Sequence, residues 1–217
     1  MIPAPFTRET KPYAANFIRA RRKYRPRKVR LLLIAESPPS SGGFFYFPTT
    51  IGKDHLFRET MKALDLWPTG VPMRRGVDKR PMLRRFQSRG LYLLDTCDFP
   101  VDKMRPRERR EAVVEQIPRL VNDVIEANPL HILVVKSSIF NPVVIALKES
   151  GFQSQILNSG PVPFPSHGNQ RIYRSMLRRA LTRHPRYRRT ARPRLVTFPS
   201  RLWLRCGYVA RLQACRY

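Results

Sequence analysis

The sequence predicts an α/β fold with three layers, α/β/α, around a four-stranded parallel sheet. The first observation is a set of short apolar runs bounded by turn residues, at residues 29–34, 91–95, 131–135 and 153–157. Such runs are typical of strands that are buried on both faces. The second observation is that apolar residues recur at helical spacing between these runs. Strands that alternate with helices form parallel sheets through right-handed crossovers.

The first expected strand, residues 29–34, is followed at once by a turn that contains Pro38 and Pro39. Two consecutive prolines remove two hydrogen-bond donors from a ladder, so the chain must leave the sheet here. The turn carries Glu36, and ligands of open parallel sheets bind beyond the carboxyl ends of the strands. Glu36 is therefore a candidate for chemistry, and the aromatic residues 44–47 offer a surface on which a flat ligand could stack.

The segments between the strands carry helix signals. A helix is expected within residues 7–18, which begin with a threonine cap. A second helix is expected over residues 54–67, with Asp54 as its N-cap. The longest helix begins at Pro106, which the first turn tolerates, and Pro118 is expected to kink it. Two further helices are expected, one after the polar turn at residues 136–138 and a basic one over residues 171–182.

Charge and composition divide the chain into three expected parts. Residues 1–28 form a basic amino-terminal arm, residues 29–182 the α/β domain, and residues 183–217 an Arg-rich extension. Residues 150–217 hold fourteen arginines and no Asp or Glu. Residues 183–194 are too polar to pack and predict a linker or a nucleic-acid arm. Residues 195–217 regain apolar side chains that could add a strand or hairpin.

The overall charge points to a polyanionic partner. The 217 residues carry 42 Lys and Arg against 15 Asp and Glu, a net charge of +27, and the 42% apolar content suffices for one core. Nucleic acid, held through its phosphates, is the leading partner, and a solvated basic surface is the alternative. Without an apolar run of ~18 residues or a signal peptide, a cytoplasmic monomer with no membrane contact is expected, nucleoid-associated in a bacterium or archaeon.

The three cysteines indicate neither a disulfide framework nor a metal site. Cys97, Cys206 and Cys215 are odd in number and contain no CxxC pair. Cys97 is expected to be a small core residue. The sequence therefore predicts no metal and no cofactor.

The segment AESPP at residues 35–39, with the Gly-aromatic stretch after it, resembles the first motif of the uracil-DNA glycosylase superfamily. That motif is a strand followed by Gly or Ala, Glu, any residue and Pro. In the iron–sulfur branch this motif reads GEAPG, and the segment in this chain differs from it at the first and last positions. The branch also has four cysteine ligands, of which Cys97 lies near one position and the amino-terminal pair has no counterpart. The resemblance thus implies a divergent member without the cluster.

A second likeness lies at the end of the second expected strand. In the superfamily an asparagine there often contacts the target base, and the matching residue is Asp95. A carboxylate accepts hydrogen bonds but donates one only when burial keeps it protonated. Two alternatives stay open: Asp95 is an ordinary turn carboxylate, or Asp98 holds the matching position.

The third likeness is the loop before the basic helix. The superfamily has a His-Pro-Ser loop there, whose histidine lies near the departing base. This chain reads Phe164, Pro165 and Ser166, and His167 is the neighbouring residue able to replace the histidine. The alternative is a loop histidine with no catalytic part. A rigid, partly apolar loop flanked by cations also suits insertion into a minor groove.

The resemblance assigns roles by position. It implies Glu36, Asp95 and His167 as catalytic residues, and a base pocket formed by Ala35, Phe45, Tyr46, Asp95 and Phe164. The DNA contacts that it implies are Ser37, Pro38, Pro165, Ser166, Gly168, Asn169, Gln170, Arg171 and Arg174.

The expected function is cleavage of the N-glycosidic bond of a flipped uracil or other deaminated base in double- or single-stranded DNA. Glu36 would stabilise the sugar cation or orient water, and His167 would stabilise the anionic base. Two alternatives stay open: a nucleic-acid-binding protein on the same scaffold with degraded chemistry, and a basic factor that associates with RNA or ribosomes.

Overall fold

The computed structural model describes residues 10–49, 52, 54–68, 70–72 and 74–182, with backbone only for residues 10–13. They belong to a first compact unit, Met1–Arg183. The expected extension over 183–217, including the strand or hairpin at 195–217, lies outside the described residues. In the described part, no helix combines the length and the apolar character needed to cross a membrane.

The centre of the fold is an open parallel sheet of three strands, β1 (Leu31–Ala35), β2 (Leu91–Asp95) and β3 (Ile132–Val134). Their order is β2-β1-β3, so β1 is central. Leu33 of β1 lies opposite Leu93 of β2 and Leu133 of β3. All residues of the three strands are buried, which explains why the sequence shows continuous apolar runs rather than alternation.

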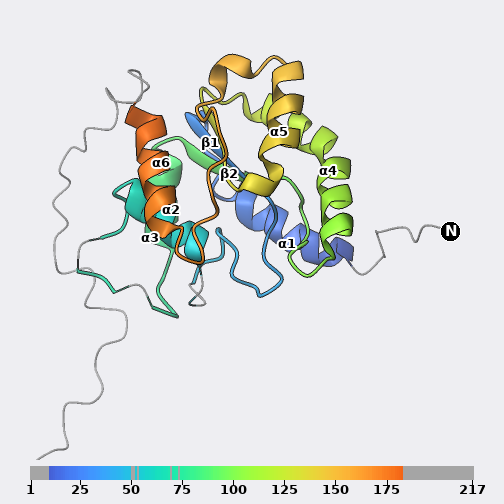
Figure 1. The fold of residues 1–217 in the computed structure, drawn as a ribbon. Coiled ribbons are helices and arrows are strands. Elements are labelled where there is room, and N and C mark those ends of the chain that lie inside the picture. Colours follow the sequence, from blue (N-terminus) through green and yellow to red (C-terminus); the bar gives the residue numbers. More distant parts are fainter. Residues whose placement is uncertain (1–9, 50–51, 53, 69, 73, 183–217) are drawn as a thin grey trace, which may run out of the picture. The chain divides into compact units, whose positions relative to one another are not determined.

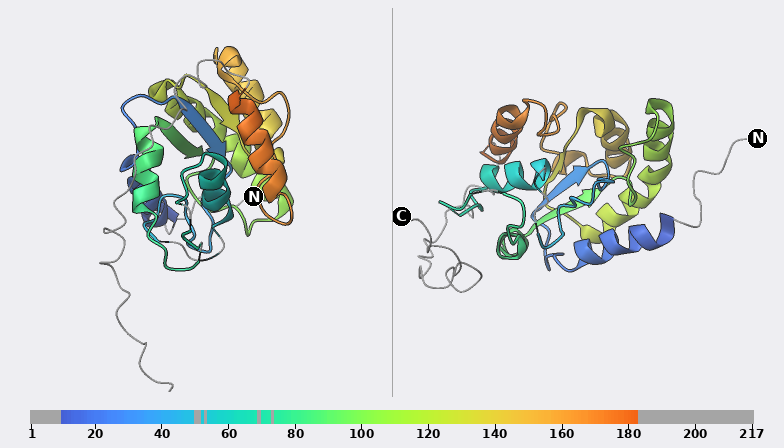
Figure 2. Two further views of the ribbon diagram at one scale, coloured as in Figure 1. Left: turned by 90° about the vertical axis from the view of Figure 1, so that its left-hand side faces the viewer. Right: turned by 90° about the horizontal axis from the view of Figure 1, so that it is seen from below.

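Helices cover both faces of the sheet. The face on which α2 (His55–Ala63), α3 (Arg80–Ser88) and α6 (Gln170–Thr182) lie is opposite the face covered by α4 (Pro106–Ala127) and α5 (Ser137–Glu149), as Figures 1 and 2 show. The mixed α/β class with a parallel sheet is thus confirmed. The chain first adds β2 on one side of β1 and then crosses back to add β3 on the other side of β1. The direction in which strands are added, the winding of the sheet, therefore reverses at β1.

The fourth strand expected at residues 153–157 is not confirmed. Gln153–Gln155 form a 3-10 helix, η1, and only Ile156 makes a single parallel bridge, to Ile132. The side chain of Asn158 then accepts from the N–H of Val134 and donates to its carbonyl, both at 3.1 Å. The polar run Gln-Ser-Gln lacks the apolar residues that a buried strand needs, so a side-chain amide completes part of the outer edge of β3.

The amino-terminal segment contains the helix that was expected there, and side chains of this segment are buried. Helix α1 spans Thr10–Arg22, and Phe17, Arg21 and Tyr24 are buried in the same unit as the sheet. Tyr24 stacks on Tyr46, with ring centroids 5.9 Å apart. The basic run that begins in the last turn of α1 hid this burial, because a few apolar residues decide how the helix packs while many charged ones dominate the composition.

Candidate functional site

A cavity of about 250 Å³ lies beyond the carboxyl ends of β1 and β2. This is where the winding reverses, the place at which open α/β sheets bind ligands. Its wall draws on several loops and helices; the lining residues include Ala35, Glu36, Ser37, Phe44, Phe45, Asp54, His55, Phe57, Asp95, Arg109, Lys136 and Phe164. The turn after β1 and the loop at Phe164, distant in sequence, therefore meet at one site.

Glu36 is bound from several sides. Its Oε1 accepts from Arg109 Nε and from Ser138 Oγ, both at 3.0 Å. Its Oε2 accepts from Arg109 Nη2 and from Lys136 Nζ. A carboxylate has about four acceptor positions, so these donors occupy both oxygens. Burial disfavours the charged form, but Arg109 and Lys136 outweigh it and hold the pKa of Glu36 below its ordinary value.

The partners of Glu36 come from the starts of two helices. Arg109 is in the first turn of α4, and Ser138 in the first turn of α5. Lys136 joins β3 to α5 with φ 92°, a conformation that residues other than glycine rarely adopt. Burial lowers the pKa of Lys136, and Glu36 offsets this only in part. Such local strain is typical of functional sites, and here it holds an ammonium group against the cavity.

A second carboxylate of the cavity, Asp54, has a different environment. It directly precedes α2 and makes no side-chain cap hydrogen bond. Instead its Oδ2 accepts from Lys79 Nζ at 3.0 Å. Lys79 is fully buried, donates also to the Phe44 carbonyl at 2.8 Å and lies 4.4 Å from the ring centroid of Phe57. Burial raises the pKa of Asp54 and lowers that of Lys79 to about 8.

Asp95, the third carboxylate, is both a wall residue and an anchor for α1. Arg21 donates to Asp95 Oδ2 at 2.9 Å and to Asp98 at 2.9 Å. Arg119 donates to the backbone carbonyls of Asp95 and Thr96. Burial raises the pKa of Asp95 to about 6, with Arg21 as a partial offset. The ion pair of Asp95 therefore supports its interpretation as a structural carboxylate, although Asp95 also lines the cavity.

The two expected stacking residues are placed differently. Phe45 lies on the cavity wall and packs edge-on against Phe57, with centroids 5.3 Å apart. Tyr46 does not line the cavity and is 1% exposed. Its hydroxyl accepts from the N–H of Leu93 at 2.7 Å and lies 3.2 Å from the Leu93 carbonyl. Because β2 is an outer strand, Tyr46 satisfies polar groups at its free edge.

The loop before α6 brings Phe164, but not His167, to the cavity. The ring centroid of Phe164 is 6.0 Å from Lys136 Nζ. His167 is exposed to solvent, and its backbone φ is 49°. Its Nδ1 lies 2.9 Å from Ser166 Oγ. Of these two residues, Lys136 lines the cavity and His167 does not.

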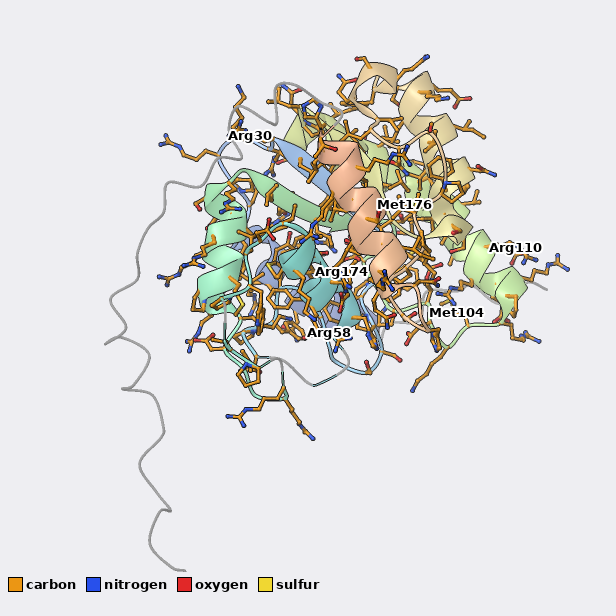
Figure 3. The ribbon with its side chains drawn as sticks, turned by 60° about the vertical axis from the view of Figure 1, so that its left-hand side comes forward. Arg30, Arg58, Met104, Arg110, Arg174 and Met176 are labelled. Atoms are coloured by element: carbon orange, nitrogen blue, oxygen red, sulfur yellow. The ribbon has the colours of Figure 1, made fainter. Side chains whose placement is uncertain are left out.

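The expected DNA contacts lie at varying depths. Ser37 is on the cavity wall, while Pro38 and Pro165 are buried. The remaining loop residues are exposed or partly exposed: Ser166, Gly168, Asn169, Gln170 and Arg171. Arg174 forms an ion pair with the buried Glu59 of α2, which also accepts from Arg58; Figure 3 labels both arginines, on the neighbouring helices α6 and α2.

Sequence reasoning missed Arg109 and Lys136 as site residues and noted Asp54 only as a helix cap. Lys136 had a usable signal, since it directly follows an apolar strand as Glu36 and Asp95 do. Arg109 had none, because it stands in a helix turn crowded with Arg and Glu.

Within the described residues, no group of three or more His, Cys, Asp or Glu is arranged to hold a metal ion. Cys97 is buried, and burial raises the pKa of its thiol to about 12. Comparisons of the chain with models of protein families, with curated proteins and with solved structures found no match.

Proposed function

We propose that this protein binds DNA and hydrolyses the N-glycosidic bond of a flipped uracil or other deaminated base, in the manner of the uracil-DNA glycosylase superfamily. The observation that carries the proposal is the cavity at the winding reversal, whose wall contains an ionised glutamate, Glu36, together with Phe45 and Phe164. The proposal includes a glycosylase-like fold, which has a fourth strand beyond β3. Single bridges at Ile156 and Val162 continue the sheet at that place and support this part of the proposal.

The size of the cavity supports a base as the ligand. Sites for drug-sized molecules have volumes of about 300–1,000 Å³. A cavity of about 250 Å³ suits one base rather than a whole nucleotide. Aromatic walls favour a flat ligand, since base–aromatic stacking contributes about 1–3 kcal/mol per base.

The charges at the cavity suit the reaction. As the bond between C1′ and the base nitrogen breaks, its electron pair goes to the base and positive charge develops on the sugar. Glu36 stays ionised at neutral pH because its pKa is low, so it can stabilise that cation. Lys136, beside Phe164, can stabilise the base anion and give it a proton. Lys136 thus takes the role first expected of His167.

The basic surface supports DNA as the partner. Helix α6 contains arginines and no acidic residue, and follows the loop that reaches the cavity. If the arginines neutralise phosphates, log affinity for a duplex falls with log salt by about 0.9 per phosphate. Deletion of residues 183–217 should flatten this slope, and an unchanged slope would assign the extension to another partner.

One observation favours a second candidate, a nucleic-acid-binding protein without catalysis. The oxygens of Glu36 are occupied by four donors, two of them from one arginine. A carboxylate used in this way can be a structural anchor that holds α4 and α5 to the turn after β1.

The test incubates the full chain with single- and double-stranded oligonucleotides that carry uracil, hypoxanthine, xanthine or mispairs, and scores abasic sites. We expect release of at least one of these bases. Ser41→Trp, which narrows the cavity at an exposed wall residue, should abolish release without loss of duplex affinity, while Ser154→Trp on η1 should have no effect. Duplex binding without release of any base would favour the binding protein, and failure to bind would overturn both candidates.

A further inference from the structure

The cavity wall holds two carboxylates in opposed environments. Glu36 is surrounded by cations that lower its pKa, while burial raises the pKa of Asp54. Paired carboxylates whose environments diverge in this way usually have different roles in one reaction. We propose that Asp54, rather than Glu36, is the general base that activates the attacking water. This inference rests on the proposed function and assigns a residue to its hydrolytic step.

The contacts of Asp54 with the part of the chain that the structure describes leave it an oxygen for water. Lys79 Nζ holds Oδ2 at 3.0 Å, and Oδ1 makes no hydrogen bond to a described residue. Lys79 is itself fixed by the Phe44 carbonyl and by the ring of Phe57, so it positions the carboxylate at the cavity wall. A general base needs a free lone pair within hydrogen-bond reach of the water.

Glu36 lacks that lone pair. To accept a proton from water it must give up a hydrogen bond from Arg109, Lys136 or Ser138, and the first two are ion pairs at a buried carboxylate. Breaking a buried pair is costly. Its low pKa also makes Glu36 a weak base, whereas it suits a residue that must stay charged.

Asp95 is the remaining buried competitor. Its Oδ2 is held by Arg21, which bridges to Asp98 and stays charged at all relevant pH values. The partner of Asp54 is instead a lysine whose pKa is lowered by burial to about 8. Among the described residues, the titratable groups that act on Asp54 are Lys79 and His55, and both favour its ionised form.

The step balances without a further reactant. Water forms the new bond to C1′ with its oxygen and gives a proton to Oδ1 of Asp54. The electron pair of the C1′–N bond leaves with the base, which takes a proton from the Lys136 ammonium. The products are the abasic sugar and the neutral base, and solvent returns Asp54 and Lys136 to their starting states.

The test compares full-length Asp54→Asn and Asp54→Ser with Asp123→Asn, on the best substrate of the wild-type protein. The Asp54 side chain makes no cap hydrogen bond to α2, so neither replacement removes a cap contact, and both remove the carboxylate. Asp123 is a matched control, since burial raises its pKa also, yet it lies on α4 beside Arg119 and outside the cavity. We expect kcat to fall about 100-fold or more in both Asp54 variants, with duplex affinity within twofold. Asp123→Asn should match the wild type.

A pH profile and a rescue experiment separate catalysis from structure. The wild-type kcat/KM should rise with pH along a limb whose pKa lies above the ordinary aspartate value, and Asp54→Asn should lose that limb. Formate should restore part of the activity of Asp54→Ser, because it supplies a carboxylate to the cavity, and chloride should not.

The outcomes distinguish the two proposals. If the wild type releases base and both folded Asp54 variants do so within threefold of it, this inference fails and the proposed function stands. The inference fails in the same way if Asp54→Asn retains the limb. If the wild type releases no base from any substrate, the proposed function fails and this inference with it.

Discussion

Two carboxylates that look alike in the sequence, Glu36 and Asp95, end in opposite environments. Each stands directly after a run of apolar residues at a strand end, each is buried and each pairs with an arginine. Glu36 has two cationic partners that are partly exposed, and its pKa is lowered. Asp95 has one guanidinium partner, 5% exposed, and its pKa is raised to about 6. Two acids at equivalent places in the sequence thus have pKa values shifted in opposite directions, because the elements packed beyond each strand end supply different partners.

The largest effect should follow removal of the partner of Asp95. Arg21→Met leaves the buried Asp95 and the partly buried Asp98 without that cation, and removing one member of a buried pair costs about 3–5 kcal/mol. Urea unfolding monitored by circular dichroism measures the loss. Arg25→Met is the control, because its pair with Glu126 is exposed and contributes about 1 kcal/mol or less. Equal losses in the two variants would remove the structural role of the Arg21 cluster.

The buried pair of Lys79 and Asp54 predicts how the free energy of unfolding depends on pH. The pKa of Lys79 is about 8 in the folded protein against 10.5 in the unfolded chain. Between these values the unfolded chain binds more protons, so the free energy of unfolding should rise with pH, by on the order of 3 kcal/mol. Lys79→Met should lack this rise. A wild-type curve that is flat or falling from pH 8 to 10.5, after subtraction of the variant's curve, would contradict the burial of the ammonium.

The cluster around Glu36 should tolerate the loss of one cation better than the Arg21 cluster does. In Arg109→Gln, Lys136 and Ser138 still bind Glu36, so we expect a cost of about 1–3 kcal/mol, below that of Arg21→Met. The same urea titration measures it. A loss that exceeds that of Arg21→Met would show that the two clusters have been ranked in the wrong order.

The comparison of Glu36 with Asp95 also shows how much of this structure can be predicted from the sequence. The place of Phe164 at the cavity is implied by the resemblance of its loop. Three strands, the alternation with helices and the meeting of Glu36 and Asp95 at one end of the sheet follow from apolar runs and strand-end turns, which are local signals. The partners Arg21, Arg109 and Lys136 do not, because a chain so rich in arginine offers many equivalent cations. Packing, rather than pattern, selects which of them reaches each carboxylate. For the same reason Tyr46 satisfies a strand edge, although its aromatic neighbours line the cavity.

The most direct test of the account is Glu36→Gln, which keeps the size of the side chain and removes its charge. A pure binding protein would gain affinity by losing a carboxylate near DNA phosphates, whereas a catalyst needs the charge. We predict duplex affinity equal to or tighter than that of the wild type, together with a fall in single-turnover base release of at least about tenfold, or ~1.4 kcal/mol of transition-state stabilisation. Base release at the same rate by both proteins would contradict the account.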